Sequence, residues 1–149
     1  MLLVLLLGLS HLSGTSATTS TSASSVNPCL DPASTEYSCE VNSIGFLVLA
    51  DCGITDEDLD DLSTCFDDIG REDIAHVRLE GNDLTTLPED VFQGLLLLDT
   101  ISLWGNALTI LPEGIFQDLP LVHTIYMSSN VFTTLPEGIF QGLPDLDYG

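Results

Sequence analysis

Four cysteines are the first side chains in this sequence whose type could do chemistry, either by forming disulfides or by binding a metal. They are Cys29, Cys39, Cys52 and Cys65. A zinc site usually takes a closely spaced pair of ligands from the chain, whereas the spacings here are ten, thirteen and thirteen residues. The even number therefore favours two disulfides, with three possible pairings.

Histidines and acidic residues are the remaining candidates for catalysis. His76 and His123 stand far apart, and neither belongs to a spacing of Ser, His and acid that marks a known nucleophile motif. The chain has no lysine and no glycine-rich phosphate-binding loop. The sequence therefore predicts neither an enzyme nor a cofactor, and the two histidines are better explained as surface side chains than as zinc ligands.

Three alternating aspartates, Asp56, Asp58 and Asp60, are similar to the start of a calcium-binding loop. Such a loop needs glycine where Asp61 stands, and Asp67 is a poor ligand for its last position. An acidic start to a helix explains these residues better, because carboxylates interact favourably with the N-terminus of a helix. We therefore expect no metal site.

The charge balance restricts the possible partners. Against 23 Asp and Glu the chain carries only Arg71 and Arg78, which gives a formal net charge of -21 at pH 7. A surface this negative repels nucleic acids and anionic membranes, and it favours basic partners and divalent cations. We therefore expect no nucleic-acid partner.

The amino-terminal residues indicate export. Residues 2–9 form an apolar run that is too short to span a bilayer, and small polar residues follow it. This pattern predicts a signal peptide over residues 1–17, cleaved after Ala17 or alternatively after Gly14; a buried apolar strand is the other interpretation. Residues 18–28 form a Ser/Thr-rich flexible linker. No later stretch reaches eighteen apolar residues, so we expect no membrane span and a secreted or extracellular location.

From Ile44 onward the sequence is repetitive. "LTTLPEDVFQGL" is followed 24 residues later by "LTILPEGIFQDL", and after another 24 residues by "FTTLPEGIFQGL". Such a period is typical of a stacked solenoid, in which neighbouring units share one core. Within each unit, a stretch such as "VRL" alternates apolar and polar residues, which predicts a strand. An asparagine follows in each unit (Asn82, Asn106 and Asn130), and its amide can bond the backbone of neighbouring turns, so we expect an asparagine ladder.

The units "VRLEGNDLTTLPEDVFQGL", "ISLWGNALTILPEGIFQDL" and "IYMSSNVFTTLPEGIFQGL" resemble the 24-residue leucine-rich repeat of extracellular proteins. The resemblance covers residues 74–145 and implies an α/β solenoid. Its expected shape is an arc with short parallel strands on the concave face and irregular or short helical segments on the convex face. Residues 29–73 would form a cysteine-containing amino-terminal cap with a divergent first repeat, and residues 146–149 would start a truncated repeat.

The divergent repeat contains its own helix signal. Leu59, Leu62, Phe66 and Ile69 have helical spacing, and Thr55 with Asp58 forms an acidic variant of a capping box. We therefore expect a true helix on the convex side of this repeat.

The disulfides of the cap follow the resemblance only in part. The family usually has a tight cysteine cluster, and the wider spacing of this chain prevents its cross-pairing from being transferred. Among the possible pairings we favour Cys29–Cys39 and Cys52–Cys65.

Strand residues that point away from the core are the best candidates for binding, because in a solenoid they stack into one continuous surface. Trp104 is the only tryptophan, and it stands where a side chain should face water, with Tyr126 and Arg78 near it on adjacent strands. Trp, Tyr and Arg are the usual hot-spot residues of interfaces. The other members of the candidate site are His76, Glu80 and Ser102. Alternatively, these residues are ordinary cross-strand pairs that only stabilise the sheet.

The resemblance implies a secreted recognition module that binds a protein or glycan through its concave strand face; a fragment of a receptor ectodomain is a variant of this hypothesis. The second hypothesis is an acidic structural component of the extracellular matrix or cell wall, whose association would depend on salt or calcium. Leu146 opens another unit, and no cysteine-rich cap follows it. Exposed core residues at such an end predict either a longer array or association with another chain.

Overall fold

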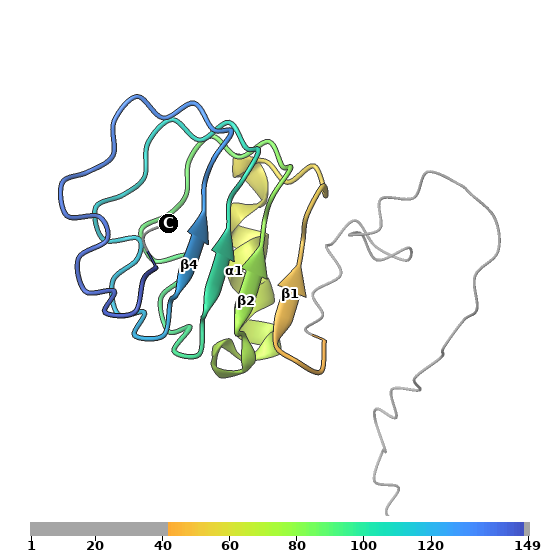
Figure 1. The fold of residues 1–149 in the computed structure, drawn as a ribbon. Coiled ribbons are helices and arrows are strands. Elements are labelled where there is room, and N and C mark those ends of the chain that lie inside the picture. Colours follow the sequence, from red (N-terminus) through yellow and green to blue (C-terminus); the bar gives the residue numbers. More distant parts are fainter. Residues whose placement is uncertain (1–41, 148–149) are drawn as a thin grey trace, which may run out of the picture.

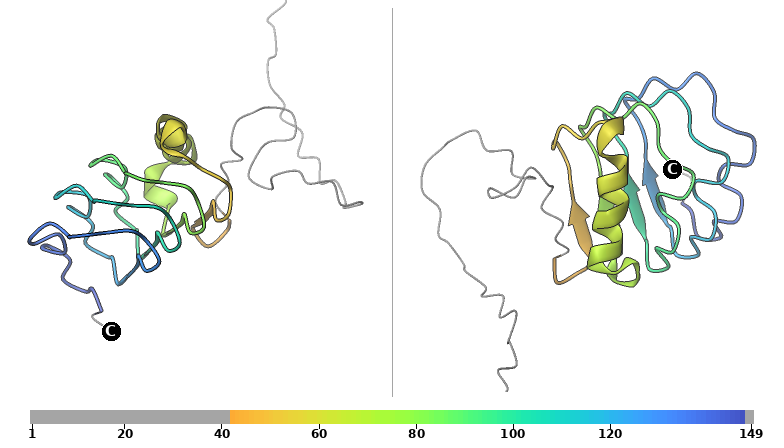
Figure 2. Two further views of the ribbon diagram at one scale, coloured as in Figure 1. Left: turned by 90° about the horizontal axis from the view of Figure 1, so that it is seen from above. Right: turned by 180° about the vertical axis from the view of Figure 1, so that it is seen from behind.

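A computed structural model of the protein describes residues 42–147. Four short strands form one parallel sheet in the order β1-β2-β3-β4 (Figure 1). Their bounds are β1 (Phe46–Val48), β2 (His76–Arg78), β3 (Thr100–Ser102) and β4 (Thr124–Tyr126). Successive repeats form the turns of one winding, with the strands on one side and the return segments on the other (Figure 2). The parallel sheet of repeated strands fits the predicted solenoid.

The register of the sheet follows the sequence repeat. Val77 pairs with Ile101, and Ile101 pairs with Ile125, so each strand lies beside its equivalent 24 residues later. Leu47 pairs with Val77 across the longer first unit. Since side chains alternate along a strand, these central residues all point inward. Leu47, Val77 and Ile101 are at most 1% exposed.

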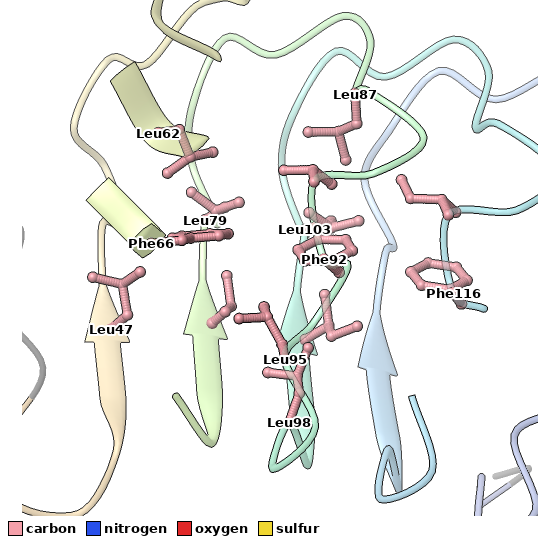
Figure 3. Close-up of a cluster of buried hydrophobic side chains, with 14 of the residues drawn as sticks. Leu47, Leu62, Phe66, Leu79, Leu87, Phe92, Leu95, Leu98, Leu103 and Phe116 are labelled. Carbon is pink, nitrogen blue, oxygen red and sulfur yellow. The ribbon is translucent and has the colours of Figure 1, made fainter. Parts of the chain in front are cut away.

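One continuous core lies between the strands and the return segments (Figure 3). Leucines such as Leu79 and Leu103 point into it from the strand side, and phenylalanines fill it from the return side. Phe92 stacks on Phe116 with ring centroids 6.2 Å apart, and Phe116 stacks on Phe140 at 6.1 Å. Equivalent side chains therefore pack on one another from repeat to repeat, which is how units that cannot bury their own apolar edges become stable together.

The return segments of the three regular repeats are turns rather than helices. Proline opens each of them, and the N–H groups of Val91, Ile115 and Ile139 donate to the carbonyls of Pro88, Pro112 and Pro136, each at 3.3 Å. Proline has no N–H and restricts the residue before it, so a regular helix cannot start earlier.

The first repeat differs, because it contains α1 (Leu59–Ile69) between the 3-10 turns η1 (Asp56–Asp58) and η2 (Arg71–Asp73). Helix α1 lies behind the sheet, on the side of the return segments (Figure 2). It buries Leu59, Leu62, Cys65 and Phe66, which confirms the predicted helix. The capping box is also present: Asp58 accepts from the Thr55 N–H at 2.8 Å, and the Thr55 hydroxyl accepts from the Glu57 N–H at 3.3 Å.

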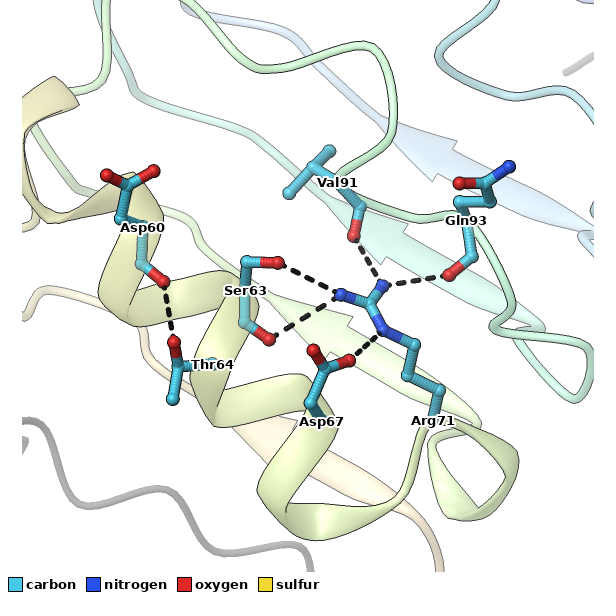
Figure 4. A network of polar contacts seen from close by, with 7 residues as sticks. All are labelled: Asp60, Ser63, Thr64, Asp67, Arg71, Val91 and Gln93. Carbon is cyan, nitrogen blue, oxygen red and sulfur yellow. Dashed lines mark hydrogen bonds and ion pairs between the residues drawn. The ribbon is translucent and has the colours of Figure 1, made fainter.

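Arg71 ties α1 to the repeat that follows it (Figure 4). Its guanidinium donates to the carbonyls of Val91 and Gln93 at 3.3 and 2.8 Å, to the Ser63 hydroxyl at 3.1 Å and to Asp67 at 2.5 Å. The charged group also lies 5.6 Å from the centre of the Phe66 ring. One side chain therefore satisfies backbone carbonyls of the next repeat and holds the helix against it.

Several expectations for the amino-terminal part lie outside the described residues. They are the signal peptide, the linker, Cys29 and Cys39. Cys52 and Cys65 are buried and are each disulfide-bonded, and the pairing that we favour stays a prediction. Between residues 42 and 147, no helix has the length and apolar character needed to cross a membrane.

Candidate binding surface

The outward side chains of the sheet make one surface, which we call the open strand face. It consists of three rows that each cross the four strands. The rows are Phe46, His76, Thr100 and Thr124; Val48, Arg78, Ser102 and Tyr126; and Ala50, Glu80, Trp104 and Ser128. The third row lies just beyond the strands, where backbone bonds continue the ladder: the Gly81 N–H donates to the Trp104 carbonyl at 2.9 Å, and the Gly105 N–H to the Ser128 carbonyl at 3.0 Å.

Two aromatic side chains of the open strand face are half exposed. Trp104 is 50% exposed and Tyr126 is 56% exposed. Trp104 follows β3 by two residues and Tyr126 ends β4; because neighbouring strands are spaced about 4.8 Å apart, both side chains belong to one patch. Large aromatic rings contribute most to the free energy of folding or binding when they are buried. Their exposure on an otherwise regular sheet is therefore typical of an interface.

Arg78 is held in place by Glu80, which follows it by two residues just beyond β2. Its Nε lies 2.6 Å from Glu80 Oε1, and its second amino group contacts the same oxygen. Burial of the Glu80 carboxyl raises its pKa, but the hydrogen bond and charge of Arg78 contribute to a larger opposite effect. The net pKa of Glu80 therefore lies below its ordinary value. The arginine side chain is 46% exposed and the glutamate 13%. The pair therefore presents a fixed guanidinium with little net charge.

Ser102 differs from the other candidates because it is buried. It pairs with Arg78 on one side and Tyr126 on the other, and it is only 8% exposed. A small side chain between two large ones is covered by them. Ser102 therefore spaces Arg78 and Tyr126 on the face and offers little contact area of its own.

His76 lies at the edge of the face where the strands begin. Its ring stacks on Phe46 with centroids 3.8 Å apart, and its Nδ1 lies 3.9 Å from Asp99 Oδ1. His123 Nδ1 lies 2.8 Å from Asp99 Oδ2. The structure thus brings both histidines to one carboxylate. No group of three His, Cys, Asp or Glu side chains within residues 42–147 could hold a metal ion.

The asparagines support the face from behind. Asn82 donates to the carbonyls of Leu49 and Leu79 at 2.8 and 2.9 Å, and it accepts from the N–H groups of Cys52 and Ile54, both at 3.0 Å. Asn106 and Asn130 repeat the pattern in the next two units. Each amide joins two consecutive repeats, so the third row is fixed relative to the other two.

Of the three aspartates that are similar to the start of a calcium loop, Asp56 joins the cap to the next repeat. Asp56 accepts from the Thr85 N–H at 2.8 Å, from the Thr86 N–H at 3.3 Å and from the Thr85 hydroxyl. Asp58 closes the capping box, and Asp60 is exposed on α1. Neither this contact nor the role of Arg71 was predicted, because both join residues that are far apart in the sequence.

Comparison with known proteins supports the repeat assignment. A family model described as leucine rich repeat matches residues 73–132 and 97–148, which together cover just over half of the chain. No curated protein matches the sequence.

Proposed function

Because the chain belongs to the leucine-rich repeat family, we propose that it is a secreted recognition module that binds a partner protein through the open strand face. Domains of this family are generally non-enzymatic modules for protein interaction. Secretion rests on the apolar run and small residues at the amino terminus. The sheet face is the concave side of the expected arc.

The half-exposed Trp104 and Tyr126 are the observation that carries this proposal. Both share the open strand face with Arg78, whose guanidinium is oriented by Glu80 before any partner arrives. Rigid aromatic and guanidinium groups lose little conformational freedom on binding, so they make efficient anchors. Stacking on a sugar ring would use the same groups, and a glycan is therefore the second ligand class that this face suits.

The test compares two double variants of the purified protein against arrays of extracellular proteins and glycans. In the first variant, Trp104→Ala and Tyr126→Ala remove the patch. The matched control is Leu97→Ala with Ile110→Ala, because these side chains are 50% and 57% exposed but lie away from the open strand face. Interactions found with the wild-type protein should weaken at least about tenfold in the first variant and persist in the control.

Two results would count against this proposal. An equal loss of binding in both double variants would show that the effect is not specific to the open strand face. Full binding by the first variant would show that Trp104 and Tyr126 are not needed for binding. Far-ultraviolet circular dichroism should show that both variants remain folded.

An acidic structural component is the alternative function, favoured by the net charge of -21. Both arginines already form ion pairs, Arg71 with Asp67 and Arg78 with Glu80, so they neutralise little of the remaining surface. Association by this route would change with salt or calcium and would be insensitive to Trp104→Ala and Tyr126→Ala. The same arrays, read at low and high ionic strength, therefore separate the two functions.

A further inference from the structure

Arg71 fills a guanidinium site on the return side of the solenoid. Its side chain donates to the carbonyls of Val91 and Gln93 at 3.3 and 2.8 Å, and it pairs with the Asp67 carboxylate (Figure 4). Two backbone carbonyls and one carboxylate therefore hold one cation through charge-assisted hydrogen bonds. Because the two carbonyls belong to a repeated segment, the same acceptors should recur 24 residues later.

The second regular repeat presents the equivalent carbonyls, those of Ile115 and Gln117. The local backbone is the same, because the N–H groups of Gln93 and Gln117 each donate at 2.9 Å to the carbonyl three residues earlier. Val91 and Ile115 are equally buried, each 2% exposed. Within residues 42–147, no group donates to the carbonyls of Ile115 and Gln117. This repeat therefore has the acceptors of the arginine site without the arginine.

A hollow of about 440 Å³ lies at these acceptors, between the first and second regular repeats. Its lining includes Ile115 and Gln117 and, from the preceding repeat, the carboxylates of Glu89 and Asp90. Glu89 reaches across the boundary, since a Cβ added to Gly114 would lie 2.5 Å from Glu89 Oε1. Carboxylates of the preceding unit therefore border the two carbonyls, as one does in the site that the cap arginine fills.

A second hollow, of about 610 Å³, lies one unit further on. Its lining includes Gln141, which stands 24 residues after Gln117, and Glu113, which stands at the same interval after Glu89. The two hollows are adjacent, because Gln117 and Asp118 line both of them. Among the described residues that line them, none carries a positive charge. The return side thus has two neighbouring hollows bordered by carboxylates.

The arginines of this chain are already engaged elsewhere. The chain has no lysine. Arg71 pairs with Asp67, and Arg78 pairs with Glu80 on the side of the strands. A second copy of the chain would bring another formal net charge of -21, which opposes association. The group that suits the hollows is therefore a cation of a different molecule.

We propose that the two hollows bind arginine side chains of a basic partner protein, presented at alternate positions of an extended segment. A guanidinium suits the site better than an ammonium, because its rigid fork of N–H groups reaches carbonyls and carboxylate together, as that of Arg71 does. This surface lies on the opposite side of the solenoid from the open strand face (Figure 2).

The spacing of the return segments matches such a partner. The stacked rings of Phe92, Phe116 and Phe140, which belong to successive return segments, lie 6.2 and 6.1 Å apart. Alternate residues of an extended chain lie about 6.6 Å apart and point to the same side. One segment with the pattern Arg-x-Arg can therefore place a guanidinium in each hollow.

The experiment is titration of the isotope-labelled, purified chain with short capped peptides, followed by nuclear magnetic resonance. The probe is Ala-Arg-Ala-Arg-Ala, and the permuted peptide Ala-Arg-Arg-Ala-Ala has the same charge with adjacent arginines. We expect the probe to cause saturable shifts confined to the amide signals of residues 89–94, 113–118 and 137–142. The permuted peptide and the lysine counterpart of the probe should bind at least about threefold more weakly. A citrulline counterpart, which keeps the shape and loses the charge, should not bind.

Two double variants test the carboxylates of the first hollow. Glu89→Gln with Asp90→Asn removes both, and we expect the dissociation constant of the probe to rise at least about fivefold at about 20 mM NaCl. Glu57→Gln with Asp60→Asn is the matched control, because it removes the same formal charge from exposed positions of η1 and α1. The control should bind the probe as the wild type does.

Several results would overturn the proposal. Equal binding of the arginine and lysine peptides, shifts spread over α1 and the sheet, or an equal loss in both double variants would show only general attraction to an acidic chain. Absence of binding, or full binding by Glu89→Gln with Asp90→Asn, would remove the site itself. Trp104→Ala with Tyr126→Ala should leave peptide binding unchanged, so this proposal and the one for the open strand face can fail separately.

Discussion

At the residue scale, three non-glycine residues between residues 42 and 147 adopt the left-handed backbone conformation: Asp51, Asp118 and Ser129. Asp118 has φ 58°, and the equivalent positions of the neighbouring repeats are Gly94 at 82° and Gly142 at 89°. This conformation costs an L-residue about 1–2 kcal/mol, although aspartate tolerates it better than most. The repeat pattern therefore identifies a strained position that one sequence unit alone would not reveal.

We expect Asp118→Gly to raise the free energy of unfolding by about 0.5 kcal/mol, since relief of the strain is partly offset by the greater freedom of glycine in the unfolded chain. Urea denaturation monitored by circular dichroism would measure the change. Gly142→Ala is the converse control: nothing lies within 4 Å of the added Cβ, so its expected loss of stability would come from the backbone alone. A destabilised Asp118→Gly variant would contradict the strain argument and assign the aspartate a favourable contact.

The sequence predicted which side chains face outward better than it predicted which residues contact one another. Trp104 and Tyr126 were placed on the outward face from the alternation of the strands, and both are half exposed. Ser102 had the same alternation, but its burial depends on the size of its neighbours Arg78 and Tyr126, which alternation does not consider. Asp99 was not singled out, because its approach to His76 and His123 arises only when repeats stack.

At the element scale, local patterns predicted the strands and α1, whereas the contacts that join elements came only from the structure. Helical spacing and the capping box lie within 15 residues, Thr55 to Ile69, and so can be recognised directly. The contacts of Arg71 with Val91 and Gln93, and of Asp56 with Thr85, join separate repeats. Their prediction would require knowing in advance how the cap sits on the first regular repeat.

The Asp56 contact predicts a pH dependence of the junction between cap and repeat. Partial burial raises the pKa of Asp56, but hydrogen bonds from Thr85 and Thr86 lower it more, so the folded pKa lies below the ordinary 3.8. Folding therefore favours the ionised form. The resulting stabilisation is complete at neutral pH. It is lost as the pH falls from the pKa of Asp56 in the unfolded chain through its lower pKa in the folded protein.

We expect Asp56→Asn to lower stability at pH 7 and to have a much smaller effect below the folded pKa of Asp56. Urea midpoints of wild type and variant, measured across this range, test the expectation. The comparison is necessary because acid also relieves repulsion throughout an acidic chain. Asp60→Asn, at an exposed position on α1, removes the same formal charge and controls for that general effect. If the difference between wild type and Asp56→Asn did not shrink in acid, ionisation of Asp56 would not support the junction.

At the scale of the whole molecule, stacking and charge oppose each other. The repeats share one core and one ladder of asparagines, so each repeat stabilises the next. The formal net charge of -21 acts against every compact arrangement of the same chain. Only Arg71 and Arg78 offset it, and both are engaged with carboxylates. Stacking of the repeats therefore stabilises the folded chain, whereas charge repulsion destabilises it. The balance between the two should depend on salt concentration.

Salt should consequently stabilise the folded monomer. Raising NaCl from about 20 mM to about 500 mM shortens the range of charge interactions below the spacing of most surface carboxylates, and we expect the urea midpoint to rise. Two ion pairs will weaken as well, but exposed pairs contribute at most about 1 kcal/mol each, which the relief of repulsion among the remaining carboxylates should exceed. Agreement between measurements at two protein concentrations shows that the effect does not come from self-association. An equal rise of the urea midpoint in KCl would identify screening as the cause, whereas a rise confined to one salt would indicate specific ion binding. A fall of the midpoint in both salts would contradict the expectation and show that the two arginine ion pairs matter more than the net charge.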